Sequence, residues 1–193
     1  MNERCFPLSI LAGAWTRRRV LAAAAFAIGC HVSVAALVVV PTEFSEMVAA
    51  SQTIVHGRVL SVQSYETAGR ATIESLVTVQ VIDTIKGEPG TTAYFRLPGG
   101  QVGRYRRVMV GAPQCARGDE VVLFLKGSAP AVPMPFGLTQ GVYRVGRDAA
   151  GQATVSPFVN TDGGRVVRGD PARVPLQLAA FTQMVRTIAS ARP

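Results

Sequence analysis

Apolar and polar residues alternate along most of the chain between residues 53 and 157, which is the period of β-strands. Two long alternating stretches come first, and the short polar segment "AGR" between them predicts the turn of a hairpin. Further strands are predicted in "TTAYFRLPGG", "RYRRVMVGAP" and "GDEVVLFLKG", followed by a last hairpin that turns at residues 148–151. The unbroken apolar run at residues 121–125 predicts a strand that is buried on both faces.

Helical spacing replaces the alternation at two places. In "PTEFSEMVAASQ", Phe44, Met47 and Val48 fall on one helical face, and Thr42 is predicted as the N-cap. Near the C-terminus, "VPLQLAAFTQMVRTIASARP" repeats apolar residues at helical spacing. The whole pattern predicts a mainly β fold, a barrel or sandwich bounded by a short N-terminal helix and a C-terminal helix.

The first 40 residues have a different character. A basic segment that ends in three arginines precedes a nearly unbroken apolar run at residues 20–40, which is the order of an export signal. The small residues "SVAA" at positions 33–36 fit a cleavage site, so we expect a signal peptide at residues 1–36 that is removed. A retained membrane anchor is the alternative, because about 20 apolar residues suffice to cross a bilayer.

Two details of this segment concern the route of export. "TRRRVL" resembles a twin-arginine signal, and an ordinary Sec signal with a basic beginning is an equal alternative. "AIGC" resembles a lipoprotein cleavage box, but the mostly apolar residues after Cys30 argue against lipidation. We therefore expect an exported protein, periplasmic or extracellular, that meets a membrane only through an uncleaved signal.

Removal of the signal changes the charge and the cysteine content. The whole chain of 193 residues has a formal net charge of +8, and the part after residue 36 keeps 16 basic and 11 acidic residues, a net charge of +5. Of three cysteines only Cys115 would remain, so no disulfide can form within the mature chain. A fold of this length must then be stabilised by its core. We expect Cys115 to be a buried structural thiol.

Several stretches together resemble a module of uncharacterised secreted bacterial proteins. These are "IVHGRVLSVQS", "VTVQVIDTIKG", "GDEVVLFL" and "GLTQGVYRV", and the resemblance extends over about residues 43–145. The module is also similar, more distantly, to netrin-like barrels, which include tissue inhibitors of metalloproteinases. The resemblance implies an OB-like (netrin-like) β-barrel. The inhibitors present an N-terminal cysteine to the catalytic zinc, and this chain has no cysteine between residue 36 and Cys115, so that mechanism does not carry over.

The usual catalytic and metal-binding patterns are missing from the sequence after residue 36. A zinc site needs three or four Cys, His or carboxylate ligands, and His56 and Cys115 are the only soft ligands left. A serine nucleophile elbow G-x-S-x-G does not occur. The strand acids Glu74, Asp83 and Glu120 lie at strand or turn ends, where solvated charges are common. We therefore expect no enzyme, no cofactor, no metal, and a structural or solvent-facing His56.

One local segment favours binding. In "PGGQVGRYRRV" at residues 98–108, three glycines precede Arg104, Tyr105, Arg106 and Arg107, which could present a basic, aromatic loop to an anion or polysaccharide. The alternative is a solvated hairpin whose arginines keep an edge strand from aggregating. The Pro-rich stretch "GSAPAVPMPFG" is too stiff for a strand and is predicted as a crossover whose Met134 and Phe136 cap the barrel. A partner-binding loop is the alternative.

The sequence therefore predicts a signal peptide at residues 1–36, an OB-like barrel at residues 37–160, and a loop and C-terminal helix at residues 161–193 that packs on or flanks the barrel. The function we expect is that of a non-catalytic module that binds a protein or envelope partner. Two alternatives are a modulator of a secreted metallopeptidase and a binder of polyanions or carbohydrates through the basic loop. Nucleic acid is not an expected partner, because exported proteins rarely meet it.

Overall fold

The computed structural model describes residues 42–67, 72–128, 130–158 and 174–191, which belong to one unit of the chain, Val39–Pro193. The predicted signal peptide and its cleavage site lie outside the described residues, as does the predicted turn at residues 68–70. Within the described part the fold is mainly β, an antiparallel sheet accompanied by two α-helices. The mainly β prediction is confirmed, and so are both bounding helices.

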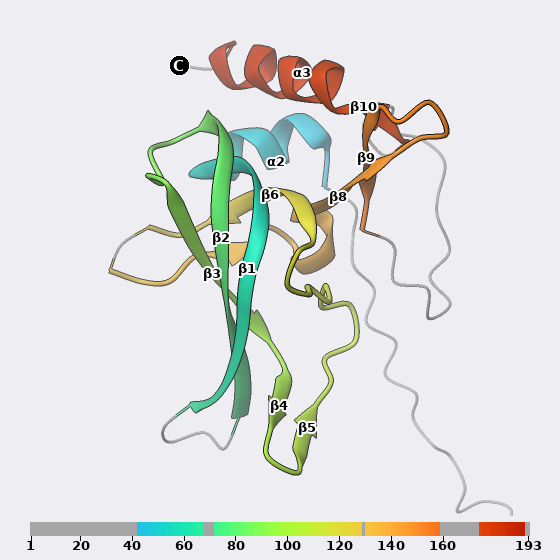
Figure 1. Ribbon diagram of the computed structural model, residues 1–193. Helices are drawn as coiled ribbons and strands as arrows, with labels where there is room; N and C mark the ends of the chain where they lie inside the picture. Colours follow the sequence, from blue (N-terminus) through green and yellow to red (C-terminus); the bar gives the residue numbers. More distant parts are fainter. Residues whose placement is uncertain (1–41, 68–71, 129, 159–173, 192–193) are drawn as a thin grey trace, which may run out of the picture. The chain divides into compact units, whose positions relative to one another are not determined.

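One antiparallel sheet carries most of the strands (Figure 1). Its order along the main path is β10-β9-β8-β6-β1-β2-β3, and β7 pairs with β6 beside this path. The longest pair is β1 and β2, the predicted hairpin. The strands of the sheet are β1 (Thr53–Thr67), β2 (Thr72–Lys86), β3 (Thr92–Pro98), β6 (Glu120–Lys126), β7 (Met134–Pro135), β8 (Val142–Arg147), β9 (Ala153–Pro157) and β10 (Leu176–Gln177).

The pairing of β1 with β2 is interrupted by register shifts near Ile54, His56 and Val59. Such bulges bend a long strand and increase its twist. Gly57 lies at one of them, and a Cβ atom there would be 2.5 Å from both the carbonyl oxygen of Gln80 and Cγ1 of Val79. The two strands approach so closely at this point that only glycine fits.

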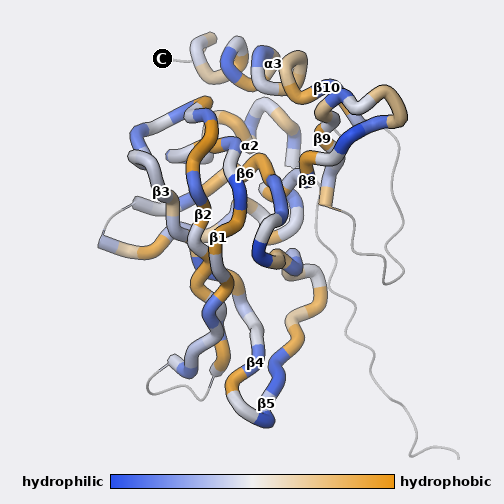
Figure 2. The backbone as a smooth tube through the Cα atoms, viewed as in Figure 1, coloured by the Kyte–Doolittle hydropathy of each residue, from blue (hydrophilic) through white to orange (hydrophobic). Residues whose placement is uncertain are grey.

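The core consists of two clusters, and β6 contributes to both. Val122 and Phe124 belong to one cluster, with residues of the two helices, while Val121, Leu123 and Leu125 belong to the other, with residues of β1, β2 and β3. All five side chains are at most 1% exposed, which confirms the strand predicted to be buried on both faces. Figure 2 shows the hydrophobic residues interleaved with hydrophilic ones along the other strands.

The two helices are held on the sheet by aromatic packing. Helix α2 (Phe44–Ala50) and helix α3 (Leu178–Ser190) bring Phe44 and Phe181 against Phe124 and Tyr143. The ring centroids of Tyr143 and Phe181 are 5.0 Å apart, and those of Phe44 and Phe181 are 5.7 Å apart. Because Phe181 is only 1% exposed, it is the main apolar anchor of α3.

The ends of α2 differ from the prediction at one point. Glu43 takes the N-cap position and no side chain caps the helix, so the prediction of Thr42 as the N-cap is wrong. The backbone N–H of Thr42 instead donates a hydrogen bond to Oε1 of Gln140 at 3.0 Å. At the other end, Nζ of Lys86 donates to the carbonyl oxygens of Val48 and Ala49, which lack partners within the helix.

Two further predictions about strands are corrected. The predicted strand "RYRRVMVGAP" ends at Arg107, because residues 108–113 have no strand beside them in the described structure. The Pro-rich stretch does contain a strand, the short β7, in which Pro135 lies opposite Leu125. Proline is acceptable there because β7 is a two-residue strand beside the main path of the sheet, so its missing N–H interrupts no long ladder. In addition, the backbone N–H of Arg96 in β3 donates to the carbonyl oxygen of Pro133 at 2.9 Å.

Candidate functional site

The basic segment predicted from the sequence forms a small β-hairpin of its own. Strand β4 (Gly100–Val102) pairs with β5 (Tyr105–Arg107), with Val102 opposite Tyr105, so the connecting loop has two residues. Gly103 is the first of them and has a φ of +55°, a left-handed conformation that glycine adopts without strain. Figure 1 shows this hairpin beside the ends of β1 and β2, away from α3.

Two serines fix the base of the hairpin. Ser64 in β1 and Ser75 in β2 share a hydrogen bond of 3.0 Å between their Oγ atoms. Ser75 Oγ also donates to the carbonyl oxygen of Gly99 at 2.8 Å, and the backbone N–H of Gln101 donates to Ser64 Oγ at 3.1 Å. A side chain at Gly100 would overlap both hydroxyls. The hairpin is therefore joined to the long strands by a defined set of contacts.

The four residues predicted as a binding site are together and exposed. Arg104, Tyr105, Arg106 and Arg107 all have exposed side chains, and the ring of Tyr105 is held by Arg104. Nη2 of Arg104 donates to the Tyr105 hydroxyl at 2.9 Å, and its guanidinium carbon lies 5.1 Å from the ring centroid. Within the described residues none of these arginines forms an ion pair with a carboxylate. Their charges are thus available to a ligand.

An apolar segment directly follows the hairpin. Val108 is 66% exposed and Val110 is 77% exposed, and Met109 between them is partly exposed. Figure 2 shows the change from a hydrophilic β5 to this hydrophobic segment. Exposed apolar residues that adjoin arginine and tyrosine are typical of protein-binding surfaces. We call residues 104–110 the hairpin surface.

A second group of polar side chains was missed by the sequence analysis. Nε2 of His56 lies 2.8 Å from Oε1 of Glu120, and Nη2 of Arg58 lies 3.3 Å from Oε2 of the same carboxylate. Burial by itself would raise the pKa of Glu120, but the hydrogen bonds from His56 and Arg58 outweigh it and lower that pKa. Because the carboxylate is ionised, Nε2 of His56 carries the proton that it donates.

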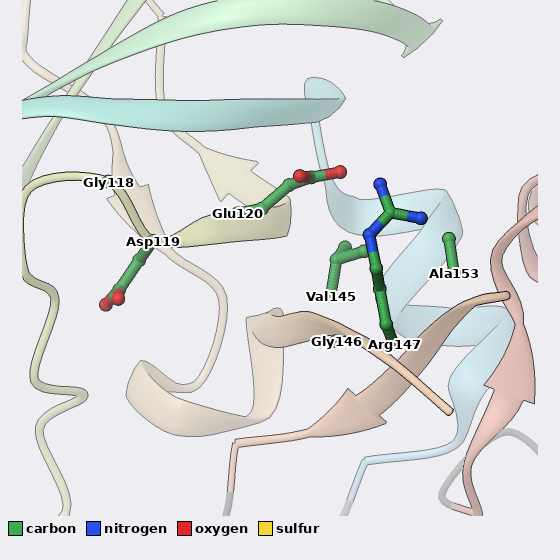
Figure 3. Close-up of a pocket in the computed structure, with 7 residues that line it drawn as sticks. All are labelled: Gly118, Asp119, Glu120, Val145, Gly146, Arg147 and Ala153. Atoms are coloured by element: carbon green, nitrogen blue, oxygen red, sulfur yellow. The ribbon is translucent and has the colours of Figure 1, made fainter. Parts of the chain in front are cut away.

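Of this group, Glu120 lines a pocket of about 320 Å³ between the start of β6 and the β8–β9 hairpin. Figure 3 shows Glu120 and Arg147 extending toward the same region, while Asp119 points away from it. Both oxygens of Glu120 already accept hydrogen bonds, and in the described structure no hydroxyl or thiol is bonded to His56. The described residues also contain no group of three His, Cys, Asp or Glu side chains that could hold a metal ion. These contacts are typical of a structural role for His56 rather than a catalytic one.

Cys115 is half-buried beside the second core cluster. Burial is the main cause that raises the pKa of its thiol to about 12, Asp119 adds to the rise, and Arg144 opposes it. A thiol with such a pKa is un-ionised at neutral pH and is a poor nucleophile. This agrees with the structural role predicted for Cys115.

The remaining predicted acids form ion pairs within the fold. Glu74 accepts a hydrogen bond from the Tyr65 hydroxyl at 3.1 Å and lies 3.6 Å from Arg96. Asp83 accepts from Nη2 of Arg186 at 2.7 Å, which joins β2 to α3. These carboxylates therefore join neighbouring elements of the fold, and they do not converge on a common cleft.

Comparison with models of protein families, with curated proteins and with solved structures gave no match for this chain. No helix among the described residues has the length and apolar character needed to span a membrane. The function must therefore be argued from the geometry of the site itself.

Proposed function

We propose that this protein is an exported, non-catalytic module that binds a protein partner in the periplasm or outside the cell through the hairpin surface. The observation that carries the proposal is the combination at residues 104–110: three arginines that have no carboxylate partner among the described residues, an exposed tyrosine, and the exposed valines at 108 and 110. Arginine and tyrosine are enriched among the residues that dominate binding energy at protein interfaces.

The apolar part of the hairpin surface favours a protein partner over a polyanion. A polyanion would use the arginines but would gain little from Val108 and Val110, whose exposure to water costs free energy until a partner covers them. The serine contacts at the base of the hairpin reduce the conformational entropy that is lost when either kind of partner binds. A carbohydrate or polyanion is the second candidate, because three neighbouring exposed arginines attract any negative ligand.

We infer further that the strands around the second core cluster form the OB-like barrel. β3, β2, β1 and β6 are consecutive neighbours in the sheet, and β7 pairs with β6. The bond from Arg96 N–H to the carbonyl oxygen of Pro133 links β3 to the residue before β7, which supports a ring through β1, β2, β3, β7 and β6. In this arrangement the β4–β5 hairpin is an insertion between β3 and β6.

The test is affinity capture with the full chain, tagged at its C-terminus and expressed in a bacterium that exports it. One variant replaces Arg104, Arg106 and Arg107 with serine. A matched control replaces Arg117, Lys126 and Arg147 with serine. These three residues are exposed and lie outside the hairpin surface, so both variants lose the same charge. We expect the control to capture the same protein partner as the wild type, and the hairpin variant to lose it.

Other results would change the conclusion in defined ways. A partner that all three chains retain would contradict the hairpin surface as the binding site. A polysaccharide in place of a protein, captured with a steep dependence on salt, would favour the second candidate. If the captured protein is a secreted metallopeptidase, an assay of its activity with and without this chain would test the modulator alternative.

A further inference from the structure

The outer edge of β5 has no strand beside it in the described part of the chain. β4 and β5 form a two-stranded sheet, and β4 is the strand that contacts β1, through the bond from Gln101 N–H to Ser64 Oγ. An edge strand without a neighbour presents backbone donors and acceptors with which another extended chain can pair. The side of the hairpin that faces away from β1 is therefore open to the addition of a strand.

The register of the hairpin decides which backbone groups face this open edge. In an antiparallel pair, opposite residues alternate between those that exchange backbone hydrogen bonds and those whose backbone groups point away from each other. Gln101 lies opposite Arg106, and the N–H of Gln101 donates outward, to Ser64. The N–H and C=O of Arg106 therefore also point away from their partner strand, toward the open edge.

The side chains along this edge define the chemistry of the chain that fits it. Arg104, Arg106 and Arg107 are exposed and lack carboxylate partners in the described structure, and the exposed Val108 and Val110 continue the same segment. The geometry points to strand addition: an extended acidic segment of a partner protein pairs with β5 through the backbone of Arg106 and places carboxylates on the three arginines. This inference rests on the proposed function, in which the hairpin surface binds a protein.

Charge and backbone chemistry favour an acidic peptide at this edge over a second copy of the chain and over a sulfated polysaccharide. A second copy of the chain that paired through β5 would place arginines directly opposite arginines, and like charges across a strand pair are destabilising. A sulfated polysaccharide would satisfy the arginines but has no peptide backbone to pair with Arg106. An acidic extended peptide satisfies the charges and the backbone groups together.

Two substitutions at Arg106 separate the backbone bond from the charge. Arg106→Ala removes the guanidinium and keeps the N–H, whereas Arg106→Pro removes both. Proline is tolerated on an edge strand where its nitrogen faces solvent, so the hairpin itself should persist. The probe is a fluorescent ten-residue peptide in which consecutive glutamates are flanked by threonine and valine, so that carboxylates lie on both faces of the added strand, as Arg106 and Arg107 do on β5. Its Kd for the full-length chain is measured by anisotropy.

We expect Arg106→Ala to weaken peptide binding a few-fold and Arg106→Pro to weaken it by roughly a further tenfold, since a lost backbone bond leaves a buried acceptor unsatisfied. A second measurement avoids any effect of proline on the hairpin. Single backbone N-methyl groups are placed along the peptide, and wild-type binding should fall at every second position, because alternate residues of an added strand point their N–H groups at β5.

Each other outcome overturns the inference and says whether the proposed function survives. If alanine and proline weaken binding equally and no alternation appears, the arginines act through charge alone. If the wild type does not bind the peptide but still captures a protein through the hairpin surface, the partner is not an acidic strand. If dimers form that Arg106→Pro abolishes, a second copy occupies the edge. If neither peptide binding nor hairpin-dependent capture occurs, the proposed function itself fails.

Discussion

Truncation of Phe181 should release α3 from the sheet. This side chain is 1% exposed and contacts the rings of Phe44, Phe124 and Tyr143 at centroid distances of 5.0 to 6.3 Å. Replacing a buried phenylalanine with alanine removes its transfer free energy and leaves a cavity, at a cost of about 3–5 kcal/mol. We expect Phe181→Ala to lower the free energy of unfolding by an amount in the upper part of this range, because three aromatic contacts are lost together.

The magnitude is large compared with the total stability of a domain, about 5–15 kcal/mol. Urea unfolding followed by circular dichroism would give the free energy of unfolding for Phe181→Ala and for a control, Gln183→Ala. Gln183 lies on the exposed face of the same helix, so its replacement should change the free energy by less than about 0.5 kcal/mol. A loss of less than about 1 kcal/mol for Phe181→Ala would refute the packing of α3 on the sheet.

Three further predictions concern the strands and the titratable groups. Gly57→Ala should lower the free energy of unfolding, measured in urea, by about 1–3 kcal/mol, because its Cβ would overlap β2. Gly146→Ala is the control, and it should be nearly neutral because the space around Gly146 is open. Equal effects of the two substitutions would contradict the close approach of β1 and β2 at Gly57. The pKa of Glu120 is lower in the folded chain than in the unfolded chain. The ionised carboxylate therefore stabilises the fold at a pH above the unfolded pKa, and this stabilisation is lost as the pH falls through the folded pKa. Glu120→Gln should therefore lower the unfolding temperature at pH 7 but not at pH 2–3, and a constant difference would argue against the His56 and Arg58 bonds. Cys115, whose pKa is raised to about 12, should react with iodoacetamide at pH 8 much more slowly in the folded chain than in urea, and equal rates would show that the thiol is not protected.

Most of the strands could be predicted from the sequence because their pattern is local. Alternation located β1, β2 and β3, and the continuous apolar run located β6. The error at residues 108–110 has a physical reason: "RYRRVMV" alternates like a strand, but a strand exists only where a neighbour supplies hydrogen bonds, and β4 extends only far enough to pair up to Arg107. For the same reason a two-residue strand such as β7 has too little sequence pattern of its own to be predicted.

The two groups of polar side chains differ in how far the sequence could reveal them. Arg104, Tyr105, Arg106 and Arg107 are consecutive, so the sequence alone indicated the basic part of the hairpin surface. The exposed Val108 and Val110 were predicted as part of a strand and were not recognised. His56 and Glu120 are 64 positions apart and meet only because β1 pairs with β6. That pairing depends on the topology of the sheet, which no local pattern specifies. The outward direction of the Arg106 backbone likewise follows from the bond between Gln101 and Ser64, two residues far apart in the chain.

Amide hydrogen exchange of the full-length chain, measured alone and with its captured partner, would show whether the hairpin surface binds that partner. We expect binding to slow exchange at residues 104–110, and most strongly at the N–H of Arg106, while exchange around the pocket beside Glu120 stays unchanged. Protection confined to the pocket or to other elements, with no change at residues 104–110, would show that the partner binds elsewhere.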